Sequence, residues 1–138
     1  MKTNSVSLLA VALILCTSAF AQAKPEQLAQ QSAEKWLALV DAGKYSESWD
    51  SAAQLFKNAV AKDQWQSMLH AARGPLGKVV SRKLKSAQYT KSLPGAPDGQ
   101  YVVIQYDTTF ENKQSAVETI TPMLDTDGQW RVSGYFIK

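Results

Sequence analysis

The sequence has one cysteine and one histidine among its 138 residues, and each scarcity narrows the chemistry open to the protein. Cys16 lies in an N-terminal segment that we expect to be removed, so the mature chain would contain no thiol. That excludes disulfides, zinc–thiolate sites and a cysteine nucleophile from the mature protein. His70 is predicted on the solvent side of a helix, where it has neither a reacting group within reach nor acidic ligands at helical spacing. We therefore expect no metal site and no cofactor.

Strong charge of one sign is also lacking. Lysine and arginine number 15 against 12 aspartates and glutamates, for a formal net charge of +3. The basic residues are spread along the chain rather than clustered. This pattern does not favour a nucleic-acid partner.

Apolar runs are short. The longest, Val6–Leu15, falls below the roughly 20 residues that a membrane-spanning helix needs. It follows Lys2 and precedes small-residue cleavage patterns within 19–23, so residues 1–23 are predicted to be a signal peptide. We expect a single exported domain at 24–138, periplasmic or secreted, with no transmembrane segment after cleavage. The alternatives are an uncleaved anchor and a lipoprotein modified at Cys16, although the preceding Leu15 is larger than such signals normally carry.

The first half of the predicted mature chain has helical periodicity. Apolar residues recur at helical spacing over 24–43, and Gly43 is placed to end this helix in a left-handed conformation. A shorter helix should start near Tyr45 and continue, with a break, toward Val60. A later helix has an apolar face and ends at the Gly-Pro pair 74–75; the face is formed by Trp65, Met68, Leu69 and Ala72.

After Gly77 the periodicity becomes that of strands. An irregular strand is predicted over 79–93 and a regular one over 101–110, with a proline- and glycine-rich loop between them. The strands at 115–124 and 130–137 flank an Asp-Gly turn at 125–128, which predicts a hairpin rather than a calcium loop. Alternation in the last strand predicts Trp130, Val132 and Phe136 on one face, opposite Arg131, Ser133 and Tyr135. Pro122 marks an edge position or a bulge.

Helices followed by four strands indicate an α+β fold, with N-terminal helices packed on a curved, four-stranded antiparallel sheet. The segment 36–45, followed by a short helix and a sheet, resembles the nuclear-transport-factor-2-like cones of the broader cystatin-like architecture. The chain also resembles a family of small exported bacterial proteins known as domain of unknown function 4019, through segments 48–50, 73–77, 81–82, 93–101, 118–123 and 128–135. The resemblance implies a cone fold and an exported location, and the family brings no activity to carry over.

Glu118 is the first candidate site residue. Strand alternation puts it on an apolar face, where a carboxylate would be desolvated unless a cation pairs with it. Arg82 and Arg131 are the expected partners. The group is either an acid in a pocket or half of an ion pair that fixes strand register, and a bulge would leave it exposed instead.

Asp107 is the second candidate. In cone folds that act as isomerases or dehydratases, a carboxylate and a tyrosine or histidine point into the concave pocket. Asp107 with Tyr101 or Tyr135 would be the nearest equivalent. The competing interpretation is a solvated sheet face, because antiparallel sheets commonly expose one side to water.

The aromatic residues are the third candidate. Trp36, Trp49, Tyr45 and Trp65 are predicted either to line a pocket between the helices and the sheet or to fill the core. The sequence therefore predicts a binding site formed by the following residues: Trp36, Trp49, Asp107, Glu118, Arg131 and Tyr135.

The sequence reveals no catalytic motif. It favours a non-enzymatic module that binds a small apolar ligand or a protein partner through the concave face or an exposed sheet edge. The alternative is a small isomerase- or lyase-like enzyme that uses Asp107 or Glu118 with a tyrosine. A homodimer with sheets packed face to face is a third option.

Overall fold

The structure, a computed structural model, describes residues 21–138. Its elements, in chain order, are α1 (Pro25–Asp41), α2 (Tyr45–Asp50), α3 (Gln54–Ala59), α4 (Lys62–Arg73), a 3-10 turn η1 (Gly74–Leu76), β1 (Val79–Thr90), β2 (Tyr101–Phe110), β3 (Lys113–Leu124) and β4 (Trp130–Ile137). The predicted signal peptide and Cys16 lie outside the described residues, apart from residues 21–23.

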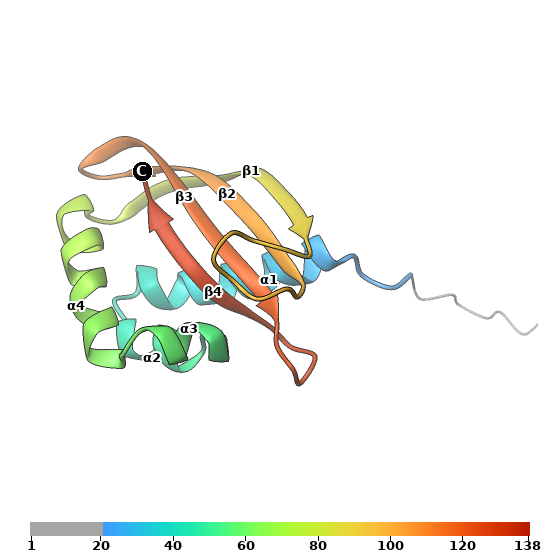
Figure 1. Ribbon diagram of the computed structural model, residues 1–138. Helices are drawn as coiled ribbons and strands as arrows, with labels where there is room; N and C mark the ends of the chain where they lie inside the picture. Colours follow the sequence, from blue (N-terminus) through green and yellow to red (C-terminus); the bar gives the residue numbers. More distant parts are fainter. Residues whose placement is uncertain (1–20) are drawn as a thin grey trace, which may run out of the picture.

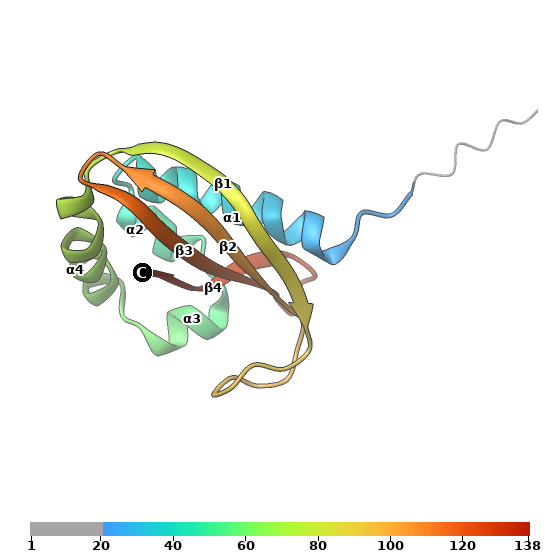
Figure 2. The same cartoon turned by 90° about the horizontal axis from the view of Figure 1, so that it is seen from above.

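The strands form one four-stranded antiparallel sheet in the order β1-β2-β3-β4. The sheet arches over the helices, with α1 beneath it and α4 at one end (Figure 1). Seen from above, the strands curve as a layer and the β1–β2 loop extends beyond them (Figure 2). This is the predicted α+β fold, with N-terminal helices packed on a four-stranded antiparallel sheet.

The end of α1 follows directly from its sequence. Gly43 has a φ of +74°, which a residue without a Cβ adopts at little cost. Its N–H donates to the Val40 carbonyl at 3.0 Å, and the next N–H, of Lys44, donates to the Leu39 carbonyl at 2.9 Å. This pair of bonds is a Schellman motif, which satisfies the last carbonyls of the helix and turns the chain toward α2.

The core lies between α1, α4 and the concave face of the sheet. α1 contributes Ala29, Ala33, Trp36, Leu37 and Val40. β2 contributes Val102, Ile104 and Tyr106, and its predicted alternation is confirmed over the whole strand. The aromatic indoles are anchored as well as packed: Trp36 Nε1 donates to the Ser48 carbonyl at 2.8 Å, and Trp65 Nε1 donates to Ser48 Oγ at 3.0 Å.

The buried stripe of α4 differs from the prediction. Trp65 and Leu69 are buried as expected, but Met68 is half exposed and Ala72 is exposed. The third buried position is Arg73, which is only 5% exposed. The stripe therefore runs at i, i+4 and i+8, and the row of Met68 and Ala72 beside it is left uncovered.

The predicted alternation of β4 is wrong beyond Val132. Val132 pairs with Pro122 and Tyr135 pairs with Ile120, so β4 carries one extra residue between these pairs. Such a bulge moves every later side chain to the other face of the sheet. Tyr135 consequently points into the core and Phe136 outward, where it is 50% exposed. The bulge lies at Pro122, one of the two positions that the sequence predicted for this residue.

The turn between β3 and β4 is the predicted hairpin. Gly128, with a φ of +81°, donates its N–H to the Asp125 carbonyl at 2.9 Å. Among the helices of residues 21–138, none combines the length and the apolar character that crossing a membrane requires.

Candidate functional site

The Glu118 carboxylate is the centre of the polar part of the concave face. The alternation of β3 puts Glu118 on the inner face with Ala116 and Ile120, and its side chain is 0% exposed. Its Oε1 accepts hydrogen bonds from Arg82 Nε at 2.7 Å and Thr108 Oγ1 at 2.5 Å. Its Oε2 accepts from Arg82 NH2 at 3.1 Å and from the Tyr135 hydroxyl. All four strands therefore meet at one carboxylate.

A second carboxylate extends this cluster to the helices. Asp41, in the last turn of α1, accepts from Arg82 NH1 at 2.8 Å and NH2 at 3.1 Å. It also accepts from NH2 of Arg73, at the end of α4, at 2.9 Å. We call Asp41, Arg73, Arg82, Thr108, Glu118 and Tyr135 the Glu118 network. Its two carboxylates balance its two guanidinium groups, as buried charges require.

The network shifts the pKa values of its members. Burial alone would lower the pKa of the Arg82 guanidinium, but hydrogen bonds to Asp41 and Glu118 reverse the effect and raise it well above its usual value. Burial opposes ionisation of Asp41, yet the hydrogen bonds from Arg82 and Arg73 keep its pKa below the usual range. Burial and the Glu118 carboxylate together raise the pKa of the Tyr135 hydroxyl far above that of a free tyrosine. These shifts favour charged Arg82 and Asp41 and a neutral Tyr135.

The chemical capacity of this arrangement is limited. A general base must accept a proton from a substrate within hydrogen-bond reach. Glu118 already accepts four hydrogen bonds, which fill the lone-pair sites of a carboxylate. The Tyr135 proton is likewise committed to Glu118. The network is therefore built to fix side chains in place rather than to exchange protons.

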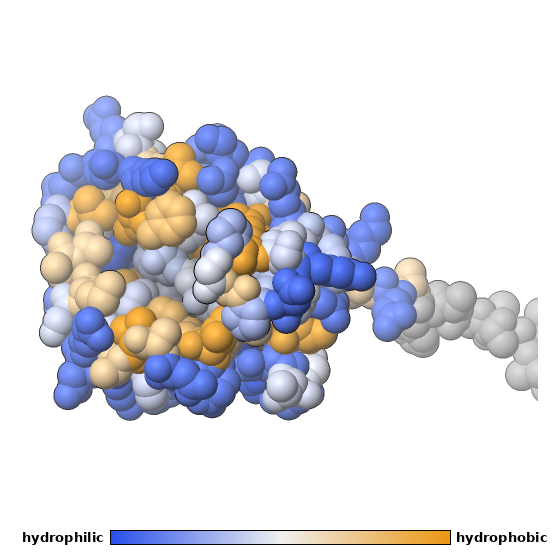
Figure 3. Space-filling model, in the orientation of Figure 1, coloured by the Kyte–Doolittle hydropathy of each residue, from blue (hydrophilic) through white to orange (hydrophobic). Residues whose placement is uncertain are grey.

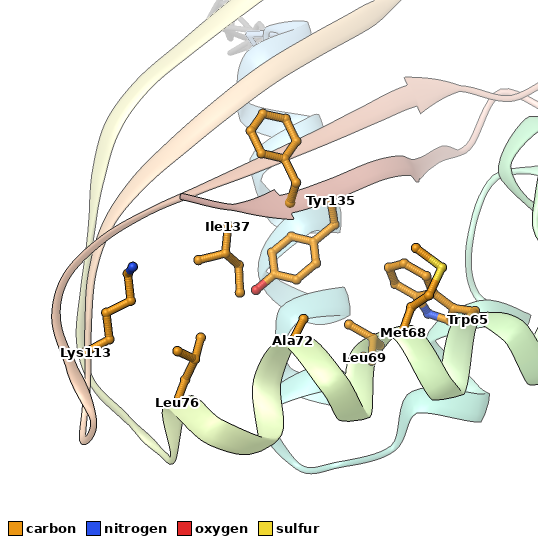
Figure 4. Close-up of a pocket in the computed structure, with 9 residues that line it drawn as sticks. Trp65, Met68, Leu69, Ala72, Leu76, Lys113, Tyr135 and Ile137 are labelled. Atoms are coloured by element: carbon orange, nitrogen blue, oxygen red, sulfur yellow. The ribbon is translucent and has the colours of Figure 1, made fainter.

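A groove opens beside this network, between α4 and the end of β4. It has a volume of about 380 Å³ and is lined by Trp65, Met68, Leu69, Ala72, Leu76, Lys113, Tyr135, Phe136 and Ile137. From α4, Met68, Leu69 and Ala72 point toward β4, and from β4 Tyr135 and Ile137 point back toward α4 (Figure 4). The surface is hollowed on this side of the molecule, and hydrophobic residues gather around the hollow (Figure 3). We call this site the α4–β4 groove.

Tyr135 joins the groove to the network. Its ring lines the groove and packs against Trp36 with 5.2 Å between centroids, while its hydroxyl is held by Glu118. Trp65 lines the same groove and lies 6.0 Å from Trp36. Three aromatic residues that the sequence singled out thus come together, two of them in the groove wall and Trp36 in the core behind it.

The other predicted site residues lie elsewhere. The Asp107 side chain is 62% exposed on the outer face of the sheet, 3.9 Å from Lys85 Nζ. Arg131 does not reach Glu118, because it binds Asp125 at 3.0 Å and Asp127 at 2.8 Å in the β3–β4 turn. Trp49 donates its indole N–H to the Val60 carbonyl at 2.7 Å and lines no part of the groove. Of the two arginines expected to pair with Glu118, only Arg82 does so.

Sequence reasoning missed Asp41 and Arg73. Both sit at the C-terminal ends of helices, where polar residues are ordinary, so neither attracts notice by itself. The sequence did contain one signal for Arg73. It lies eight residues after Trp65, so it continues the buried stripe of Trp65 and Leu69 on the same face of α4. In residues 21–138, no group of three or more histidine, cysteine, aspartate or glutamate side chains is placed to hold a metal ion.

A comparison with models of known protein families gives a match. A protein-family model described as "Protein of unknown function (DUF4019)" matches residues 32–135, a span that includes the Glu118 network and the lining of the α4–β4 groove except Phe136 and Ile137. No curated protein matches the sequence.

Proposed function

Because the chain belongs to the family described as protein of unknown function (DUF4019), which assigns no activity, we propose a function from the groove itself. The protein is a non-enzymatic binding module, and the α4–β4 groove is its binding site. The observation that carries this proposal is a cavity of about 380 Å³ whose walls are mainly apolar and whose polar groups are few. Ligand sites have this size and character.

The Glu118 network supports binding by keeping the groove in shape. It connects all four strands to the ends of α1 and α4 through charge-assisted hydrogen bonds. Tyr135, one wall of the groove, is held at its ring by Trp36 and at its hydroxyl by Glu118. A site that is already ordered loses less conformational entropy when it binds a ligand.

The same contacts count against the enzyme alternative. That reading needs a carboxylate and a tyrosine that face a substrate. Glu118 and Tyr135 do meet, but the Tyr135 hydroxyl donates to Glu118, and Glu118 also accepts from Arg82 and Thr108. Asp107 lies on the outer face, away from the groove.

We further propose that the fold is a cone of the cystatin-like, nuclear-transport-factor-2-like kind. A curved antiparallel sheet that arches over N-terminal helices supports this assignment (Figures 1 and 2). So does the position of the groove, at the place where the sheet and α4 leave an opening (Figure 3).

We propose that the protein is exported, as the sequence of residues 1–23 suggests. If so, the protein recovered from the periplasm of its host should begin at residue 22 or 24, after one of the predicted cleavage patterns. Intact-mass measurement decides this. A mass that includes residues 1–21 contradicts cleavage, and a lipid on Cys16 would show a lipoprotein instead.

Binding in the groove can be tested with the apolar dye N-phenyl-1-naphthylamine, whose fluorescence rises in apolar surroundings. We expect the dye to bind the wild-type protein and the variant Ala72→Trp to bind it at least about tenfold more weakly, because the indole would fill the groove from α4. Ala72 is exposed, so the fold should tolerate the change.

The matched control is Ala71→Trp, which adds the same side chain to an exposed neighbouring position outside the groove. It should bind the dye like the wild type. Absence of dye binding to the wild-type protein, or equal loss in both variants, would contradict the groove as the binding site.

A further inference from the structure

β4 is an edge strand, and its register shows which backbone groups face away from the sheet. Lys138 and Val117 exchange both backbone hydrogen bonds, at 3.0 Å each. Hydrogen-bonded and non-hydrogen-bonded pairs alternate in an antiparallel ladder. The pairs of Ile137 with Glu118 and of Tyr135 with Ile120 are therefore non-hydrogen-bonded pairs, and the N–H and C=O groups of Tyr135 and Ile137 point to the free edge.

The two halves of the β4 edge differ in whether their outward backbone groups are hydrogen-bonded to the rest of the protein. In the first half, the Trp130 carbonyl accepts from Ser32 Oγ at 2.7 Å, and the Val132 carbonyl accepts from the Ala53 N–H at 2.8 Å. α1 and the α2–α3 connection thus cover that half. In the second half, no group within residues 21–138 hydrogen-bonds to the outward backbone of Tyr135 or Ile137.

The opposite edge of the sheet is protected. β1 carries two register shifts, and Lys83 and Lys85 are exposed on it. Bulges and lysines are the devices by which proteins prevent an edge from pairing with another chain. The stretch from Tyr135 to Ile137 has neither a bulge nor a charged side chain, so it remains open to pairing.

The open stretch borders the α4–β4 groove. Tyr135 and Ile137 point into the groove toward α4 (Figure 4). A strand added beside β4 would send alternate side chains in the same direction, over the apolar residues of α4. Lys113 is the one charged side chain in the groove lining, and the lining contains no acidic residue, so the groove favours an acidic group near Lys113.

We propose that the occupant of the groove is an extended segment of a partner protein, which pairs with β4 at Tyr135 and Ile137 as an additional antiparallel or parallel strand. Apolar side chains at alternate positions would enter the groove, and an acidic residue would face Lys113. Free backbone donors and acceptors beside an apolar groove are the requirements of strand addition, in which main-chain bonds give affinity and side-chain pockets give specificity. This inference rests on the proposed function and names the ligand class for the same groove.

The probe is a phage-displayed library of random peptides of about eight residues, selected on the full chain. We expect selected peptides to alternate apolar and polar residues and to carry an acidic residue at one end. When the best synthetic peptide binds, hydrogen exchange of the Tyr135 and Ile137 amides should slow by at least about tenfold, because both would become hydrogen-bonded.

Two changes test the backbone bonds directly. An analogue of the peptide that is N-methylated at the pairing positions keeps its side chains but loses its donors, and it should bind at least about tenfold more weakly. In the protein, Ile137→Pro removes an outward N–H, a change that edge strands accept, and also replaces a side chain that lines the groove; it should weaken peptide binding similarly. Ile137→Val, which keeps the N–H, should bind within about threefold of the wild type.

The outcomes separate this inference from the proposed function. If the N-methylated analogue and Ile137→Pro bind as tightly as their parents, strand addition is wrong. If the dye binds but selection yields no groove-binding peptide, the partner is not an extended peptide, and the groove stays a site for small apolar ligands. If neither dye nor peptide binds, both the groove as a binding site and strand addition at β4 are wrong.

Discussion

Replacement of Glu118 by glutamine is expected to lower the free energy of unfolding by about 3–5 kcal/mol, the usual cost of breaking a buried ion pair by removing one partner. The glutamine would leave Arg82 facing an amide and would no longer accept hydrogen bonds at both oxygens. Urea unfolding followed by tryptophan fluorescence measures the change, since the buried indoles of Trp36 and Trp65 would become exposed.

Asp107→Asn is the matched control for this variant. It removes a carboxylate from the neighbouring strand, but one that is 62% exposed and lies 3.9 Å from its lysine. Exposed pairs of this kind contribute little, so the change should stay within about 0.5 kcal/mol. Equal effects of the two substitutions would show that Glu118 is not the residue on which the buried network depends.

The second large effect concerns the two arginines. Arg82→Met should also cost about 3–5 kcal/mol, because it removes four hydrogen bonds and leaves Glu118 fully buried without a cation. Arg73→Met should cost no more than about 1 kcal/mol. Arg73 is 5% exposed, yet its Nε and NH1 have no hydrogen-bond partner, so the methionine would relieve two unsatisfied donors while filling similar volume.

The same urea titrations compare the two arginine variants. Asp41 keeps both hydrogen bonds from Arg82 when Arg73 is replaced, which is why the loss should be small. A larger cost for Arg73→Met than for Arg82→Met would contradict this assignment. It would mean that Arg73, packed with its guanidinium carbon 5.0 Å from the Phe110 ring centroid, is the cation on which the stability of the network depends.

Where the apolar residues recur at regular helical or strand spacing and the turn residues are distinctive, the sequence is sufficient to predict the structure. The helix up to Gly43, the alternation of β2 and the Asp-Gly hairpin depend on local rules, and each is confirmed. Glu118 was identified in the same way, because strand alternation set it among apolar neighbours. Its pairing with Arg82 is predicted because the two residues are expected in neighbouring strands; the pair is confirmed, although β2 lies between β1 and β3 and the side chains meet across it.

The predictions that proved wrong concern features that rules on local sequence cannot predict. A one-residue bulge in β4 reversed the positions of Tyr135 and Phe136, and with them the inner wall of the groove. Arg131 was expected at Glu118 because both lie in adjacent strands. Register, however, places Arg131 opposite Met123 at the far end of β3, beside the acidic turn. The inward orientation of Arg73 depends on a carboxylate from α1, which is distant in sequence.

The contacts between α1 and β4 have a consequence for the order in which the protein can fold. The first helix binds the last strand: Ser32 donates to the Trp130 carbonyl, and Trp36 packs against Tyr135. A chain made from its N-terminus would present the apolar faces of α1 and α4 before any strand exists to cover them. The nascent protein therefore cannot complete its core until β4 has been made and can pack against α1.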